Sequence, residues 1–83
     1  MEIGTVTGAV WATRKAARME GLALLVVETD RGRRVAADAL GAGVGDRVLL
    51  TSGSGARLPC PDAPIDTSVV AILDERGLTN VRP

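Results

Sequence analysis

Few side chains in this sequence are suited to catalysis or metal binding. The chain has no histidine and one cysteine, Cys60, which lies between two prolines. Zinc and iron–sulfur sites need clustered Cys or His ligands, and a Ser-His catalytic pair needs a histidine. We therefore predict no metal site, no cofactor and no catalytic pair of this kind, and we interpret Cys60 as an incidental loop thiol. A lone cysteine forms no internal disulfide, so a reducing cytoplasm is the simplest setting.

Carboxylates offer another route to catalysis, because two of them can act together as general acid and base. The candidates in this chain are Asp62, Asp66, Asp74 and Glu75. No spacing among them singles out a pair, and charged loop residues are ordinarily solvated. We therefore predict that the protein is not an enzyme.

The glycine-rich stretch GAGVGD, residues 41–46, has the composition of a phosphate-binding loop. A dinucleotide fingerprint, however, places its glycines between a strand and a helix, whereas this stretch leads into the apolar residues 48–50. The GK[ST] signature of a phosphate-cradling loop is also missing. A second glycine- and serine-rich stretch, residues 52–57, follows the same apolar segment. We interpret the two stretches as shaped surface loops at either end of a rigid strand.

Charge and aromatic content argue against nucleic acid and membranes as partners. The ten basic and ten acidic residues cancel, so no net charge favours either partner. Trp11 is the sole aromatic residue, which leaves little surface for base stacking. Arg31, Arg33 and Arg34 cluster at an expected turn, where we interpret them as solubilising. No segment is apolar for long enough to span a bilayer, and residues 1–6 lack the features of a signal peptide.

The apolar pattern predicts short strands separated by glycine and proline. The expected strands are residues 2–13, 22–29, 33–37, 47–51 and 68–74. A polar connection follows the first strand, and Asp30-Arg31-Gly32 suits a hairpin turn. Three prolines hold the connection before the last strand extended. This pattern predicts an all-β fold, a small five-stranded barrel similar to the oligonucleotide-binding (OB-like) type.

The 83 residues are expected to form one domain, 1–83, in which 76–83 is a loosely held tail. A domain of this size has a thin core and usually needs further support. Residues 22–27 and 69–73 are apolar without interruption, so both faces of these strands need cover. A flattened sandwich is one solution, but it is hard to build from so short a chain. Neighbouring copies are the other solution, and equivalent subunits usually close into a ring.

Several stretches together are specific to one family. The chain resembles the pentameric vertex proteins of bacterial microcompartment shells, the ethanolamine-utilisation/carboxysome vertex family. The matching stretches are residues 4–15 (GTVTGAVWATRK), 20–27 (EGLALLVV), 35–50 (VAADALGAGVGDRVLL), 53–57 (GSGAR) and 65–74 (IDTSVVAILD). Each stretch alone is weak evidence, but their combination in this order is specific.

The resemblance implies a β-barrel protomer that assembles into a cyclic homopentamer. Such pentamers cap the vertices of a polyhedral shell, where they meet hexameric and pseudohexameric shell proteins, inside the bacterial cytoplasm. It also implies two sets of assembly residues. The rim that docks against neighbouring hexamers would comprise Ala12, Thr13, Arg14, Lys15, Gly41, Ala42, Gly43, Val44, Gly45 and Asp46. The subunit contacts or ring axis would involve Gly53, Ser54, Gly55, Ala56 and Arg57.

Three features depart from the family pattern. The hairpin at residues 30–32 is short, Gly55 replaces a common serine, and the Pro59-Cys60-Pro61 loop is unusual. Two other classes of protein remain as alternatives. A nucleic-acid-binding barrel of the OB or SH3-like kind would need exposed aromatics and a basic face. A co-chaperonin-like ring would need a long mobile loop.

Overall fold

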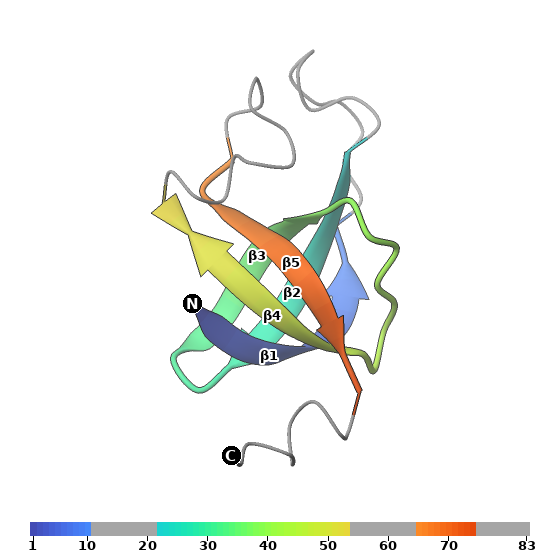
Figure 1. Cartoon of the computed structure of the whole chain (residues 1–83), viewed down its shortest axis with the longest axis horizontal. Coiled ribbons are helices and arrows are strands. Elements are labelled where there is room, and N and C mark those ends of the chain that lie inside the picture. Colours follow the sequence, from blue (N-terminus) through green and yellow to red (C-terminus); the bar gives the residue numbers. More distant parts are fainter. Residues whose placement is uncertain (11–21, 54–64, 75–83) are drawn as a thin grey trace, which may run out of the picture.

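The computed structural model describes residues 1–10, 22–53 and 65–74, which form five strands closed into a barrel (Figure 1). The strands are β1 (Glu2–Ala9), β2 (Ala23–Thr29), β3 (Gly32–Asp38), β4 (Arg47–Ser52) and β5 (Thr67–Leu73). Their order around the barrel is β1-β2-β3-β5-β4, and β4 pairs with β1 to close it. Neighbouring strands are antiparallel except β3 and β5, which are parallel at Ala37 and Ser68. The predicted five-stranded all-β barrel is therefore confirmed.

The predicted strand bounds hold to within one residue for four of the five strands. The first strand was predicted too long, because it ends at Ala9 rather than continuing to residue 13. The backbone N–H of Val10, the residue after the strand, donates to the carbonyl of Leu24 at 2.8 Å. Residues 11–13 lie outside the described part of the chain, as do the polar connection, the proline-containing stretch 54–64 and the predicted tail.

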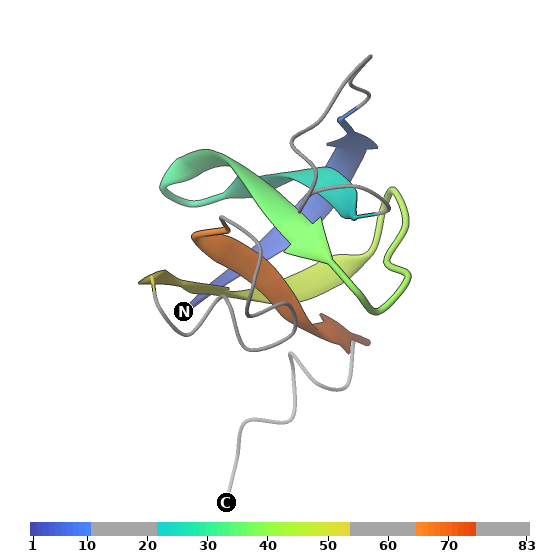
Figure 2. The same ribbon diagram turned by 90° about the horizontal axis from the view of Figure 1, so that it is seen from above.

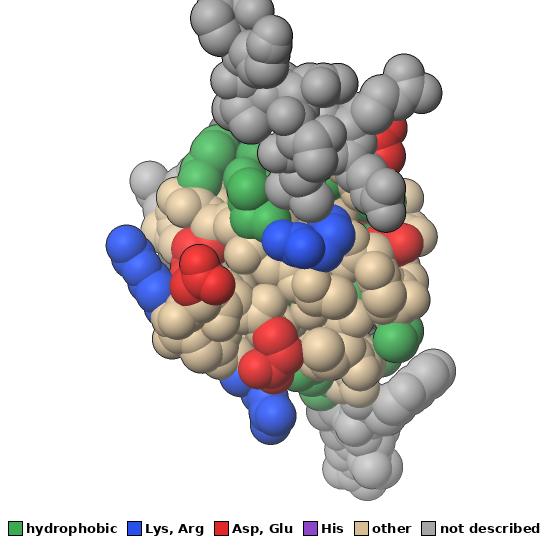
Figure 3. All heavy atoms as spheres, turned by 90° about the horizontal axis from the view of Figure 1, so that it is seen from below, with side chains coloured by type: hydrophobic (Ala, Val, Ile, Leu, Met, Phe, Trp, Pro, Cys, Tyr) green, Lys and Arg blue, Asp and Glu red, His purple; other side chains and the backbone are tan. Residues whose placement is uncertain are grey.

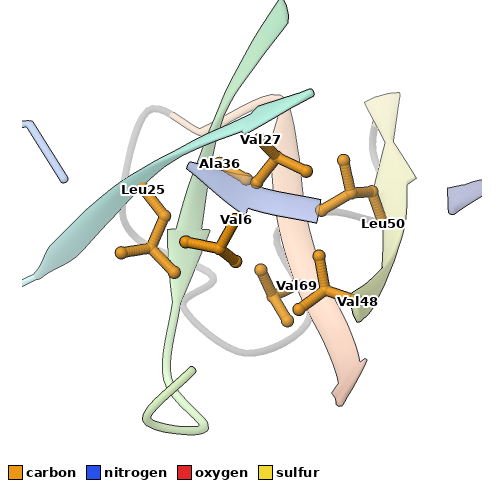
Figure 4. Close-up of a cluster of buried hydrophobic side chains, with 7 residues drawn as sticks. All are labelled: Val6, Leu25, Val27, Ala36, Val48, Leu50 and Val69. Atoms are coloured by element: carbon orange, nitrogen blue, oxygen red, sulfur yellow. The ribbon is translucent and has the colours of Figure 1, made fainter. Parts of the chain in front are cut away.

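The core lies inside the barrel and consists of small aliphatic side chains from all five strands (Figure 4). Alternate residues of each strand point inward, as the period of two requires. The inward set is Val6, Leu25, Val27, Ala36, Val48, Leu50 and Val69. Short branched side chains suit a narrow barrel, because an interior of this width has no room for larger groups.

The first strand passes very close to the second at Gly4. Gly4 pairs with Thr29 of β2 on one side and with Val48 of β4 on the other. A Cβ atom at this position would lie 2.5 Å from Val27 Cγ1 and 2.7 Å from the Glu28 carbonyl oxygen. Only glycine therefore permits β1 to cross here and close the barrel. A bulge between Val6 and Gly8 then redirects the strand along β2.

The outer surface of the barrel is only partly covered by its own chain. A small outer cluster contains Ala37 and Ile65, packed against Leu22 and Leu24. Elsewhere large aliphatic side chains of the outer face remain in contact with solvent, since Val35 is 51% exposed and Ile3 is 44% exposed. The two apolar runs predicted to need outside cover are likewise not fully shielded, since Ala23 of the first run is exposed and Ile72 of the second is 43% exposed.

Candidate assembly surface

The loop that joins β3 to β4, residues 39–46, is held by a buried carboxylate. Asp38, the last residue of β3, is 6% exposed. Its Oδ1 accepts the Leu40 backbone N–H at 2.9 Å, and its Oδ2 accepts the Ala42 N–H at 2.7 Å. Bonds from backbone N–H groups to an ionised oxygen are stronger than neutral ones. Asp38 therefore fixes the start of the loop.

A second carboxylate fixes the end of the same loop. Asp46 Oδ2 accepts the Gly43 N–H at 2.8 Å, and the Asp46 N–H donates to the Gly43 carbonyl at 3.0 Å. Two backbone hydrogen bonds of 2.9 Å then join the loop to β1: the Gly45 N–H donates to the Val6 carbonyl, and the Val6 N–H donates to the Asp46 carbonyl. The loop is thus braced at both ends and is not a free connection.

The braced loop presents backbone and two large apolar side chains to solvent. Leu40 is 52% exposed and Val44 is 73% exposed. Gly41 and Gly45 have φ angles of 86° and 94°, a region that favours glycine. Gly43 has no such φ, and a Cβ there would meet nothing closer than Asp46 Oδ2 at 4.0 Å. The protomer itself therefore does not require glycine at position 43.

The two predicted sets of assembly residues lie at opposite ends of β4 (Figure 1). The rim residues 41–46 immediately precede the strand, whereas Gly53 follows it. Gly53 has a φ of 74° and its N–H donates to the Asp66 carbonyl at 2.9 Å. A six-residue strand spans about 20 Å, so the described members of the two sets, residues 41–46 and Gly53, lie at opposite ends of the barrel. The remaining candidates, residues 12–15 and 54–57, lie outside the described residues.

An ion pair closes one end of the barrel interior. Arg34 Nε–H donates to Glu2 Oε1 at 3.1 Å, and Thr29 Oγ1 lies 3.0 Å from Glu2 Oε2. Each of these residues pairs with an inward-facing residue of a neighbouring strand, because Glu2 pairs with Leu50, Thr29 with Gly4 and Arg34 with Val27. They therefore lie just above the core, at one mouth of the barrel. The hydrogen bond from Arg34, followed by the one from Thr29, holds the pKa of the Glu2 carboxyl below its ordinary value of 4.5, although desolvation opposes them.

We expect this ion pair to make stability depend on pH in the acid range. Because the folded protein lowers the pKa of Glu2, the pair stabilises the fold above pH 4.5 and is lost as pH falls through the lowered value. Glu2→Gln should therefore reduce the loss of stability between pH 6 and pH 3, measured as the change in urea midpoint. Arg33→Gln, at the more exposed pair with Glu28, is the matched control. Equal acid sensitivity in wild type and Glu2→Gln would contradict this role.

The other charged groups singled out in the sequence do not form a site. The arginine cluster divides, because Arg33 Nε donates to Glu28 at 2.7 Å on the outer surface while Arg34 turns toward the barrel mouth. Asp66 and Asp74 lie just before and just after β5, too far apart to act together. Asp62 and Glu75 lie outside the described residues. On the face seen in Figure 3, acidic and basic side chains are interspersed, with no patch of one sign.

The described ranges also offer no metal centre. Within residues 1–10, 22–53 and 65–74, no group of three or more His, Cys, Asp or Glu side chains could hold an ion. In these same ranges we find no helix with the length and apolarity of a membrane span. The surface instead offers a braced loop and exposed aliphatic side chains, which suit contact with other proteins.

Two supporting interactions were not predicted from the sequence. The role of Asp38 had a local signal in the sequence, because an Asp side chain often accepts hydrogen bonds from backbone N–H groups a few residues later in the chain. The Glu2–Arg34 pair had none, because 32 residues separate its members. Only the closed barrel brings β1 and β3 together at that end.

Comparison with known proteins shows the family to which the chain is similar. The family model described as "Ethanolamine utilisation protein EutN/carboxysome" matches residues 1–74. The carboxysome shell vertex protein CcmL of Synechococcus elongatus is 38% identical, over 96% of this chain and 90% of that protein. The microcompartment shell vertex protein PduN of Salmonella typhimurium is 40% identical, over 89% and 96% respectively. The pentameric microcompartment shell protein GrpN of Rhodospirillum rubrum superposes with a TM-score of 0.79 at 37% identity, covering 89% and 93%.

Proposed function

The chain belongs to the ethanolamine utilisation protein EutN/carboxysome family and is a non-enzymatic vertex protein of a bacterial microcompartment shell, and we propose that its homopentamers dock against hexameric and pseudohexameric shell proteins through the loop at residues 41–46. The observation that carries the docking proposal is the bracing of this loop by Asp38 and Asp46. A preorganised loop loses little conformational entropy when it meets a partner.

The chemistry of the loop supports a contact made by shape rather than by charge. The exposed large side chains of the whole connection, residues 39–46, are those of Leu40 and Val44, and both are apolar. Both of its carboxylates accept bonds from the loop's own backbone, so they help to shape it. Gly43 leaves its backbone open on the solvent side, which allows a neighbouring backbone to approach without a side chain between them. We propose that this close approach lets a pentamer fit the corner between flat arrays of hexamers.

The remaining rim and ring residues enter the proposal from the family resemblance. We assign residues 12–15 to the same docking rim and residues 53–57 to subunit contacts or the ring axis. Gly53 is the described member of the second set, and its position at the far end of β4 from the docking loop is compatible with that division.

The assembly state tests the first part of this function. Native mass spectrometry of the full chain at micromolar concentration is expected to give a five-subunit species. Exposed aliphatic side chains such as Val35 and Ile3 are expected to be buried in that species, because burial of apolar surface drives association. A monomer alone in the spectrum at this concentration would contradict the proposal.

A further inference from the structure

One outer face of the barrel carries an apolar row across three strands. Gly8 of β1 pairs with Val26 of β2, and Val26 pairs with Val35 of β3. Paired residues project from the same face of a sheet. Leu25 and Val27, on either side of Val26, are buried in the core, so Val26 and its partners face outward. We call Gly8, Val26 and Val35 the glycine row.

Among the residues that the structure describes, nothing explains the glycine in this row. A Cβ at Gly8 would meet no atom of the described residues within 4 Å, whereas at Gly4 it would collide with β2. Gly8 follows the bulge in β1, but it lacks the positive φ that a glycine-requiring bulge needs. Glycine in the interior of a strand weakens it. Its presence is therefore best explained by a surface that approaches from outside.

A second apolar row lies on the other side of the barrel. Ile3 of β1 pairs with Leu49 of β4, and Leu49 pairs with Ala71 of β5. Val48 and Leu50, which flank Leu49, are fully buried, so this row also faces outward. Ile3 is 44% exposed, and together with Met1 and Leu49 it lines an open hollow that is bordered by the charged residues Glu2, Asp30 and Arg31. We call Ile3, Leu49 and Ala71 the leucine row.

The two rows have the arrangement that a ring requires. Figure 2 shows β2 and β3 on one side of the barrel and β4 and β5 on the other, with β1 running from one side to the other. A five-membered ring is built from head-to-tail contacts, in which one patch meets a different patch on the next copy. The protomer thus has two unlike apolar patches on separate sides.

We propose that the glycine row of each protomer packs against the leucine row of the next protomer around the ring. This inference rests on the proposed pentamer and names the surfaces that form it. The absence of a side chain at Gly8 allows the larger Ile3 and Leu49 side chains of the neighbour to lie against the sheet. The adjacent outward row is Thr5, Glu28 and Arg33, which gives the apolar contact a polar border, as in other protein interfaces.

A charge swap tests the pairing of the two rows. Val35→Lys and Leu49→Glu should each replace the five-subunit species by monomer in native mass spectrometry, because each would bury an unpaired charge. The double variant Val35→Lys/Leu49→Glu should regain pentamer, since every contact would then join Lys at position 35 to Glu at position 49 of the next copy. Val44→Lys, which changes an exposed valine outside both rows, is the matched control and should stay pentameric.

Circular dichroism of the same samples separates loss of assembly from loss of folding. Gly8→Leu provides a second route, because its side chain has space in the protomer but would occupy the contact; we expect a folded monomer. Pentamers that persist in both single variants and in Gly8→Leu would overturn the pairing. So would a double variant that stays monomeric when the singles are folded monomers. A monomeric wild type would instead refute the proposed pentamer itself.

Discussion

Replacing Gly4 by alanine is expected to destabilise the barrel by about 3 kcal/mol, and replacing it by valine is expected to prevent folding. The added Cβ would lie 2.5 Å from Val27 Cγ1 and 2.7 Å from the Glu28 carbonyl oxygen. A side-chain methyl can rotate away, but the carbonyl belongs to the β1–β2 ladder and can move only if the two strands separate. A small domain has little stability to lose, so the effect should be large.

Urea unfolding at one fixed protein concentration measures this change, because association contributes to apparent stability. Gly43→Ala is the matched control: it adds the same methyl group where the nearest atom is 4.0 Å away. We expect the midpoint of that control to stay close to wild type. A Gly4→Ala variant with the midpoint of the control would show that the crossing of β1 and β2 tolerates a side chain.

The second large effect is expected on the shell rather than on the barrel. Gly43→Val should leave the pentamer intact but prevent closed shells from forming. Position 43 has an ordinary φ and open space around it, so the protomer accommodates the side chain. In the proposed contact, the two methyl groups of the introduced valine would lie between the backbone of the pentamer and that of the neighbouring hexamer. Such overpacking costs about 1–3 kcal/mol per contact, and the cost recurs at each of the five edges of a pentamer.

Co-expression with hexameric shell proteins, followed by electron microscopy, distinguishes closed from open shells. Native mass spectrometry of the purified variant tests whether the ring survives. Ala39→Val lies in the same connection but outside the rim at 41–46, and it should leave closure unchanged. Closed shells of normal shape containing Gly43→Val pentamers would show that this loop does not lie at the junction with hexamers.

These two glycines show how sequence and structure contribute differently. Five strands could be predicted from the alternation of apolar residues and from the glycine and proline residues that separate the apolar runs. The predicted bounds are within one residue of the observed ones for four of these strands. Local pattern carries this information because side chains of a strand alternate between core and solvent. The end of β1 at Ala9 was missed, since the threonine and valine pattern continues beyond the last ladder pair.

The family and the vertex role were also accessible from the sequence, because they rest on motifs spread along the chain. The sequence further located the glycine-rich loop at 41–46 and the need for cover outside the barrel. It did not indicate that Asp38 is buried and holds that loop, although the bonds are local. Burial of Asp38 depends on strands that are distant in the chain.

Contacts between strands were decided by the tertiary structure alone. The sequence presents Gly4, Gly8 and Gly43 as the same residue, yet a Cβ at Gly4 would collide with β2, whereas at Gly8 or Gly43 it would meet no described atom closer than 4.0 Å. Likewise, Glu2 and Arg34 become partners because the barrel closes. The order and register of strands determine which side chains meet, and these depend on packing of the whole chain rather than on any segment.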